Sequence, residues 1–165
     1  MNDGLQLFPD RESAVDRDDK LELKVWLRLL TCTNLIEAQI RSLLRERFAT
    51  TLPRFDLMAQ LQRSPRGLSM GELSSRLMVT GGNVTALVDA LEQDGLVARG
   101  PNPKDRRSQV IRLTAKGRRS FNDMTPAHEE WVDSLLVGMS RADLAMLFQL
   151  LGRLKGSVQD AVRKA

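Results

Sequence analysis

The sequence contains few of the side chains on which most enzymes depend. Its 165 residues include one Cys, one His and no Tyr, and aromatic residues make up only 4%. The single cysteine, Cys32, excludes an internal disulfide and is typical of a reducing compartment. Glycine-rich phosphate loops and clusters of His and Cys with metal-ligand spacing are also missing. The sequence therefore predicts no catalytic residue, no metal site and no cofactor.

Long apolar runs are equally absent. Charged residues interrupt every apolar stretch, so the sequence predicts no membrane-spanning helix. The first 19 residues are polar and acidic rather than basic and then apolar, so they do not resemble a secretory signal. We expect a cytoplasmic protein whose residues 1–19 form a mobile acidic tail.

The net charge of +4 is unevenly distributed along the chain. Residues 51–120 hold 12 Lys and Arg against 6 Asp and Glu, a net of +6, and the remainder has a net of −2. A basic segment between neutral or acidic ones indicates a polyanionic partner for the middle of the chain.

Apolar periodicity predicts two helices in the first part of the chain. From Lys20 to about Phe48, apolar residues recur every three to five positions, as on one face of a helix. Pro53 fits the first turn of a second helix, which the Ser, Pro and Gly residues of 64–67 end.

The clearest local signals follow. Ser69 and Glu72 have the spacing of a capping box, which predicts a short helix as far as about Met78. Residues 79–82 form a turn, and Thr80 is placed to cap a third helix over 81–93. Two short helices joined by a tight turn predict a helix-turn-helix.

The next segment predicts a basic β-hairpin, or wing. Residues 96–99 and 109–113 have the pattern of strands, and the polar, proline-containing residues 100–108 are expected to form the loop between them. Thr114 is placed to cap a further helix, and Pro126 predicts a kink or break there, with Thr125 capping a renewed helix.

The last helix is expected to begin at Ser140. Its apolar stripe, like that of the first helix, has to be buried against another surface, and an intertwined dimer satisfies both stripes. The predicted fold is mainly α with a small β-hairpin. A winged helix-turn-helix domain (51–120) is flanked by N-terminal (20–50) and C-terminal (121–165) dimerisation helices.

The ordered motifs resemble the MarR family of bacterial regulators over roughly residues 20–165. The resemblance rests on Leu-Ser-Met-Gly-Glu-Leu at 68–73, Val-Thr-Gly-Gly-Asn-Val-Thr at 79–85, Asp-Arg-Arg at 105–107 and Leu-Thr-Ala-Lys-Gly at 113–117. It implies a homodimer, a palindromic double-stranded DNA operator, and repression relieved by a small molecule bound between the dimerisation and DNA-binding parts. The sequence of the 79–85 motif also resembles that of the branch of the family that regulates aromatic-acid catabolism, which includes members responding to hydroxycinnamoyl-CoA thioesters.

Base reading is expected to fall to the polar first turn of the 81–93 helix, which contains no Lys or Arg. Asn83 is suited to pair with adenine, although it is also a residue that caps helices. In the family pattern Asp105 orients Arg107 for the minor groove and Arg106 meets phosphate; the alternative is a solvated hairpin tip. The predicted DNA-binding residues are Ser69, Arg76, Thr80, Gly81, Gly82, Asn83, Thr85, Lys104, Asp105, Arg106 and Arg107.

An effector pocket is expected between the first, second and fifth helices. His128 is either a packed core histidine or a pocket residue, and arginines such as Arg54 either meet an anionic group or form a solvated face. The predicted pocket residues are Trp26, Leu30, Arg54, Phe55, Met58, Met124 and His128.

Two other side-chain types have simpler interpretations. The family resemblance implies that a redox-sensing cysteine on the first helix pairs with tyrosine hydroxyls, and this chain has no Tyr. Cys32 also has the spacing of the apolar stripe, so a buried structural thiol is favoured over a redox sensor. Met58, Met70, Met78 and Met124 are expected in the core.

The sequence thus favours a ligand-responsive repressor that is not an enzyme. The alternatives are a redox-sensing repressor acting through Cys32, an architectural protein that binds DNA by charge alone, and a winged-helix module for protein contacts. The wing and the polar turn disfavour the last of these, and the modest net charge of +6 disfavours binding by charge alone.

Overall fold

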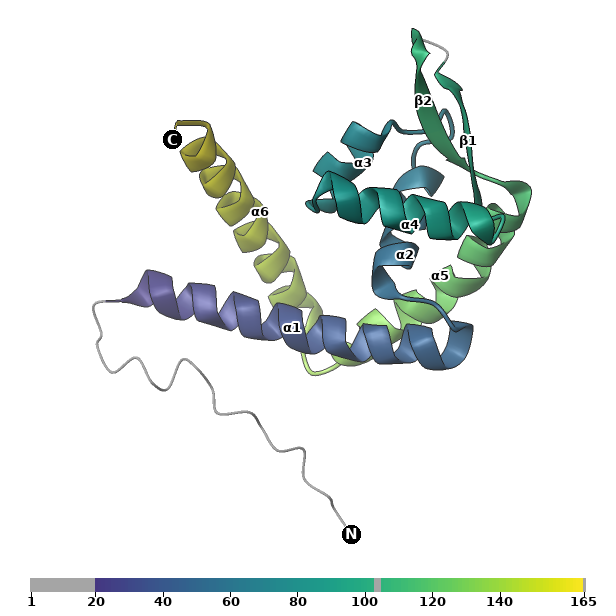
Figure 1. Cartoon of the computed structure of the whole chain (residues 1–165). Coiled ribbons are helices and arrows are strands. Elements are labelled where there is room, and N and C mark those ends of the chain that lie inside the picture. The colour runs from purple at the N-terminus through teal and green to yellow at the C-terminus, as the bar shows by residue number, and fades with distance from the viewer. Residues whose placement is uncertain (1–19, 103–104, 165) are drawn as a thin grey trace. The chain divides into compact units, whose positions relative to one another are not determined.

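The computed structural model describes residues 20–102 and 105–164, with side chains described for all of these except 105–107 (Figure 1). The predicted residues 1–19 tail lies outside the described part. The predicted fold class is confirmed, since the described residues form six helices and one two-stranded hairpin. In chain order these are α1 (Leu21–Phe48), α2 (Leu52–Gln62), α3 (Met70–Leu77), α4 (Gly81–Gln93), β1 (Val97–Asn102), β2 (Asp105–Leu113), α5 (Ala115–Leu135) and α6 (Arg141–Lys164).

The chain divides into two units, Met1–Ala127 and His128–Ala165. The core of the first unit is formed by the apolar faces that the sequence periodicity predicts. Figure 1 shows α2, α3 and α4 grouped together, with the hairpin of β1 and β2 extending from them. Each fully buried Leu, Ile or Val stabilises the fold by roughly 1.5–3 kcal/mol. These buried residues include Leu44, Leu57, Leu61, Leu73, Val84, Val88, Leu91, Val97 and Ile111.

The helix-turn-helix consists of α3 and α4. The predicted capping box is confirmed: Ser69 Oγ accepts from the Glu72 amide at 3.3 Å, and the Glu72 carboxylate accepts from the Ser69 amide at 2.7 Å. The predicted limits of α4 are also confirmed. Thr80 occupies the position before α4, but its side chain makes no capping hydrogen bond, so that part of the prediction is wrong.

Met78, which ends α3, does not belong to the core as predicted. Its backbone is left-handed (φ +53°) and its side chain is 90% exposed. The helical spacing that would place Met78 inside no longer applies, because the turn rotates the chain between α3 and α4. Met58 and Met124 are buried as predicted, and Met70 is half-buried.

The hairpin is longer than predicted. β1 and β2 pair antiparallel from Val97 opposite Leu113 to Pro101 opposite Gln109, with an irregularity before Asn102 pairs with Asp105. Much of the predicted 100–108 loop is therefore strand. Proline is tolerated because a two-stranded sheet has only edge strands, where a missing amide need not interrupt the ladder.

α5 is continuous through Pro126, so the predicted break and renewed helix are wrong. Proline removes one amide donor, which leaves the carbonyl four residues earlier, at Asn122, without its helical partner. Both Pro126 and Asn122 are exposed, so water can satisfy that carbonyl. Thr125 does not cap a new helix; its hydroxyl donates to the Phe121 carbonyl at 2.9 Å. The Thr114 cap is confirmed, since its Oγ1 accepts from the Gly117 amide at 3.0 Å.

In the second unit, α6 begins after Ser140, whose Oγ accepts from the Asp143 amide at 3.1 Å. None of its side chains is buried, and the members of the predicted stripe are half-buried or exposed: Leu144, Leu147, Leu151, Leu154, Val158 and Val162. The apolar stripe of α6 thus has no cover within its own unit.

The first half of α1 is similarly uncovered. Trp26 is 58% exposed, and Cys32 is exposed, so the prediction of a buried thiol is wrong for the single chain. The stripe of α1 meets the core only near its C-terminal end, at Ile40 and Leu44. Within the described residues, no helix combines the length and apolar character that crossing a membrane requires.

Candidate nucleic-acid interface and the adjoining cavity

The N-terminal turn of α4 presents polar side chains and bare backbone to solvent. Gly81, Gly82, Asn83 and Thr85 are exposed, whereas the opposite face of the helix is buried. Asn83 is the third helical residue and Thr80 precedes the helix, so Asn83 does not occupy the capping position. Its side-chain amide is therefore exposed on the face of the helix that can meet a base edge. Thr85 Oγ1 donates to the Gly81 carbonyl at 3.0 Å, which fixes its rotamer.

The acidic residues at the far end of α4 are engaged within the protein. Asp89 and Glu92 both accept from the guanidinium of Arg99 on β1, and Glu92 also accepts from the Arg99 amide at 3.1 Å. The pKa of Arg99 is raised, chiefly by its hydrogen bond to Asp89. These bonds fasten the base of the hairpin to α4, the second and base-reading helix of the predicted helix-turn-helix (the recognition helix). The sequence interpretation did not single out Arg99. The signal that could have found it is the pair of carboxylates three residues apart, Asp89 and Glu92, shortly before an arginine in a predicted strand.

The residues predicted to contact phosphate from α3 have partners in the fold. The Ser69 hydroxyl belongs to the capping box, and Arg76 Nη1 donates to Ser64 Oγ at 3.0 Å. Arg76 is exposed and lies with Arg63 and Arg66 around a cavity of about 420 Å³ beside the hairpin, whose Asn102 and Val110 also line it. This cluster of arginines makes the surface between α3 and the hairpin suitable for a polyanion.

The wing tip falls largely outside the described part of the chain. Lys104 is not described, and Asp105, Arg106 and Arg107 are described only as the backbone of the start of β2. The expected orientation of Arg107 by Asp105 therefore remains a prediction.

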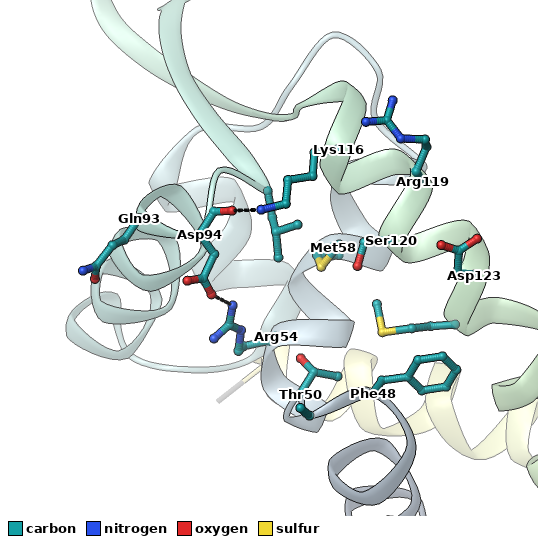
Figure 2. A pocket seen from close by; sticks show the side chains of 13 residues that line it. Phe48, Thr50, Arg54, Met58, Gln93, Asp94, Lys116, Arg119, Ser120 and Asp123 are labelled. Carbon is teal, nitrogen blue, oxygen red and sulfur yellow. Dashed lines mark hydrogen bonds and ion pairs between the residues drawn. The ribbon is translucent and has the colours of Figure 1, made fainter.

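A second cavity, of about 680 Å³, lies within the first unit beside the C-terminal end of α4 (Figure 2). Of the seven predicted pocket residues it contains Arg54, Met58 and Met124. The lining also includes residues that the sequence interpretation did not assign to it: Phe48, Ala49, Thr50, Gln93, Asp94, Leu96, Lys116, Arg119, Ser120 and Asp123.

The other predicted pocket residues lie elsewhere. Phe55 is buried and stacks on Phe121 with ring centroids 5.2 Å apart, as part of the core. Trp26 and Leu30 lie in the first half of α1 and do not line the cavity. His128 belongs to the second unit, where burial lowers its pKa. Among the described residues, no three His, Cys, Asp or Glu side chains are grouped as metal ligands.

The cavity combines cations with apolar walls. Arg54 forms an ion pair with Asp94, and Lys116 Nζ donates to the Asp94 carbonyl at 2.8 Å. The Arg54 guanidinium, through its hydrogen bond, holds the pKa of Asp94 below its ordinary value, so Asp94 is ionised at neutral pH. Phe48 and Met124 supply apolar surface. Such a lining suits a small molecule with an apolar body and an anionic group.

Comparison with known proteins places these features in one family. The sequence profile of the MarR family matches residues 50–108. The transcriptional activatory protein BadR from Rhodopseudomonas palustris is 31% identical over 109 residues, which are 65% of this chain and 62% of that protein. The chain spans about three fifths of the length of the curated relatives it matches first.

Solved structures agree with this fold over a longer range. A MarR family transcriptional regulator from Silicibacter pomeroyi has 34% sequence identity and a TM-score of 0.72, covering 83% of this chain and 94% of that one. FabT from Streptococcus pneumoniae, solved in complex with DNA, has 25% identity and a TM-score of 0.70, covering 85% of this chain and 99% of that one.

Proposed function

Because this chain belongs to the MarR family of transcriptional regulators, we propose that it is a homodimeric DNA-binding repressor released from its operator by a small-molecule effector. The observation that carries this proposal is the position of the 680 Å³ cavity, which includes the last residues of the recognition helix in its lining. A ligand bound there contacts the same element whose first turn faces DNA.

Recognition of DNA is divided between α4 and the wing. Asn83 and Thr85 read base edges in the major groove, while Gly81 and Gly82 allow the backbone to approach closely. Arg106 and Lys104 neutralise phosphates, Arg107 enters the minor groove, and Arg76 adds a phosphate contact beside α3. This division assigns specificity to a helix without Lys or Arg and affinity to the basic residues around it.

A dimer accounts for the uncovered stripes of α1 and α6. Each stripe exposes large apolar side chains, such as Trp26 on α1 (58% exposed) and Val162 on α6 (72% exposed). Monomeric proteins rarely leave an extended apolar stripe uncovered in water. A two-fold dimer presents two recognition helices to successive major grooves roughly 34 Å apart, so the operator is an imperfect palindrome.

The effector is proposed to be an aromatic acid or its CoA thioester. The cationic and apolar lining favours this chemistry over a neutral polar ligand. An exposed Cys32 keeps a redox-sensing repressor as the second candidate, because an accessible thiol can be oxidised.

The test is operator release. Footprinting on the DNA upstream of the gene identifies the site, and binding is then titrated with cinnamate, its CoA thioester and hydrogen peroxide. Release by either aromatic compound, with Cys32→Ser behaving as wild type, supports the proposal. Release by peroxide alone, lost in Cys32→Ser, replaces it with the redox mechanism. A protein that covers DNA without a discrete footprint is an architectural protein instead, and a reporter assay separates repression from activation.

A further inference from the structure

Asp94 is the point at which α2, α4 and α5 meet. It ends α4, and its carboxylate pairs with Arg54, which lies 40 residues earlier in the chain at the start of α2. Its backbone carbonyl accepts from Lys116 Nζ at 2.8 Å, at the start of α5. Figure 2 shows Arg54 and Lys116 approaching Asp94 from two sides. The C-terminal end of the recognition helix is therefore fastened by two cations of the cavity wall.

Arg54 is only partly satisfied in this arrangement. Its Nη2 donates to Asp94, but its Nε is buried and has no hydrogen-bond partner among the described residues. Nε and Nη2 form one edge of the guanidinium, and this edge matches the two oxygens of a carboxylate. Asp94 uses one donor of an edge that can bind two. A buried donor left without an acceptor is unfavourable, so the edge favours a second oxygen.

The rest of the cavity lining indicates which kind of molecule can supply this second oxygen. Phe48, Met58 and Met124 form apolar wall, and Arg119 adds a further cation. The side chain of Arg54 is 23% exposed and that of Asp94 is 50% exposed, so the cavity side of the guanidinium is more sheltered from water than the carboxylate it binds. An aromatic carboxylate satisfies both parts of the lining at once.

Resting on the proposed function, we propose that the Nε–Nη2 edge of Arg54 is the anion-binding element of the effector site, and that the effector's carboxylate competes with Asp94 for it. Binding of the effector displaces the Asp94 carboxylate and frees the C-terminal end of α4. Asp94 thus sets both the affinity for the effector and the coupling of the site to the recognition helix, since a ligand shifts a conformational equilibrium only through contacts that differ between the two states.

The first test measures ligand binding without DNA, by calorimetry on the full-length protein with cinnamate as the probe. Asp94→Asn removes the competing charge and should tighten cinnamate binding at least threefold, whereas Arg54→Met should weaken it at least tenfold. Arg54→Lys should not restore binding, because an ammonium group has no two-donor edge. Asp133→Asn, an exposed carboxylate on α5 outside the cavity, is the matched control and should leave the affinity unchanged.

Two further measurements exclude a merely structural role for these residues. Cinnamamide has the same shape without the charge; it should bind at least tenfold more weakly and be indifferent to Asp94→Asn. Hydrogen exchange of a peptide covering residues 90–96 should accelerate when cinnamate binds, and thermal melts identify any variant that is simply unfolded.

The outcomes separate this inference from the proposed function. Equal affinity of cinnamate for wild type and Asp94→Asn, or no measurable cinnamate binding to the wild type, overturns the competition at Arg54. Operator release by another compound would then leave the proposed function standing. Failure to bind any operator would overturn the proposed function even if the calorimetry gave the expected order of affinities.

Discussion

The guanidinium of Arg99 donates to the carboxylate of Asp89, so the first strand of the wing is tied to the recognition helix by a side-chain bond. Glu92 completes this contact one helical turn later. Because the two reading elements of a winged helix must fit two different grooves at once, their relative placement affects DNA affinity as well as stability.

Replacing Arg99 by Met should reduce both properties. Asp89 is 58% exposed, so water screens the ion pair and its contribution is at most about 1 kcal/mol. We expect Tm to fall by roughly 2–4 °C in a chain of this size and operator affinity to fall about fivefold. Thermal melts and fluorescence anisotropy measure the two effects. Normal affinity in a destabilised Arg99→Met protein would show that the bond does not position the wing.

The two wing arginines should differ in the salt dependence of binding. Arg106→Ala removes a phosphate contact and should lower the slope of log K against log salt concentration by about 0.9. Arg107→Ala should cost at least about tenfold in affinity, because an oriented groove contact is lost. Arg141→Ala, exposed at the start of α6, serves as the charge-matched control. Unchanged operator binding by Arg107→Ala would rule out the groove contact.

Gly117 should tolerate no side chain. A Cβ there would lie 1.9 Å from the Leu96 carbonyl oxygen, a backbone atom that cannot move without displacing β1. We expect Gly117→Ala to destabilise by about 3 kcal/mol or more. Gly71 lies in α3 with open space around its Cβ position, so Gly71→Ala should instead stabilise by about 0.5–1 kcal/mol. Urea denaturation of both variants checks this pair, and a Gly117→Ala protein as stable as wild type would contradict the close approach of α5 to β1.

Asp56 should make the protein less stable as the pH rises. Burial raises the pKa of its carboxyl, Glu37 raises it further, and Arg41 opposes both. The folded chain therefore holds this proton more tightly than the unfolded chain, whose carboxyl titrates at its ordinary value of 3.8. Stability is lost as the pH rises from 3.8 through the folded pKa, and the loss persists at neutral pH.

Asp56→Asn removes the loss of stability that ionisation of this carboxyl causes. The variant should have a higher Tm than wild type at pH 7, and the difference should shrink as the pH falls toward 3.8. Asp133→Asn, exposed on α5, is the control. A Tm difference that is the same at both pH values would show that the ionisation of Asp56 is not its cause.

Local sequence determined the helices and their ends. The capping box at Ser69 and Glu72 forms as expected, and α4 has its predicted limits, because caps and apolar periodicity act within a few residues. The same locality explains the errors. Local sequence predicts a break at Pro126, yet α5 is continuous. The carbonyl that loses its helical partner belongs to an exposed residue, so water can satisfy it.

What only the tertiary structure decided depends on residues far apart in sequence. Arg54 and Asp94 meet across 40 positions, and no periodicity relates a residue at the start of α2 to one at the end of α4. Met78 and Cys32 have the spacing of core residues, but exposure depends on whether another element covers that side of the helix. A helical pattern fixes which residues share a face, whereas packing decides which faces are buried and which charges come together.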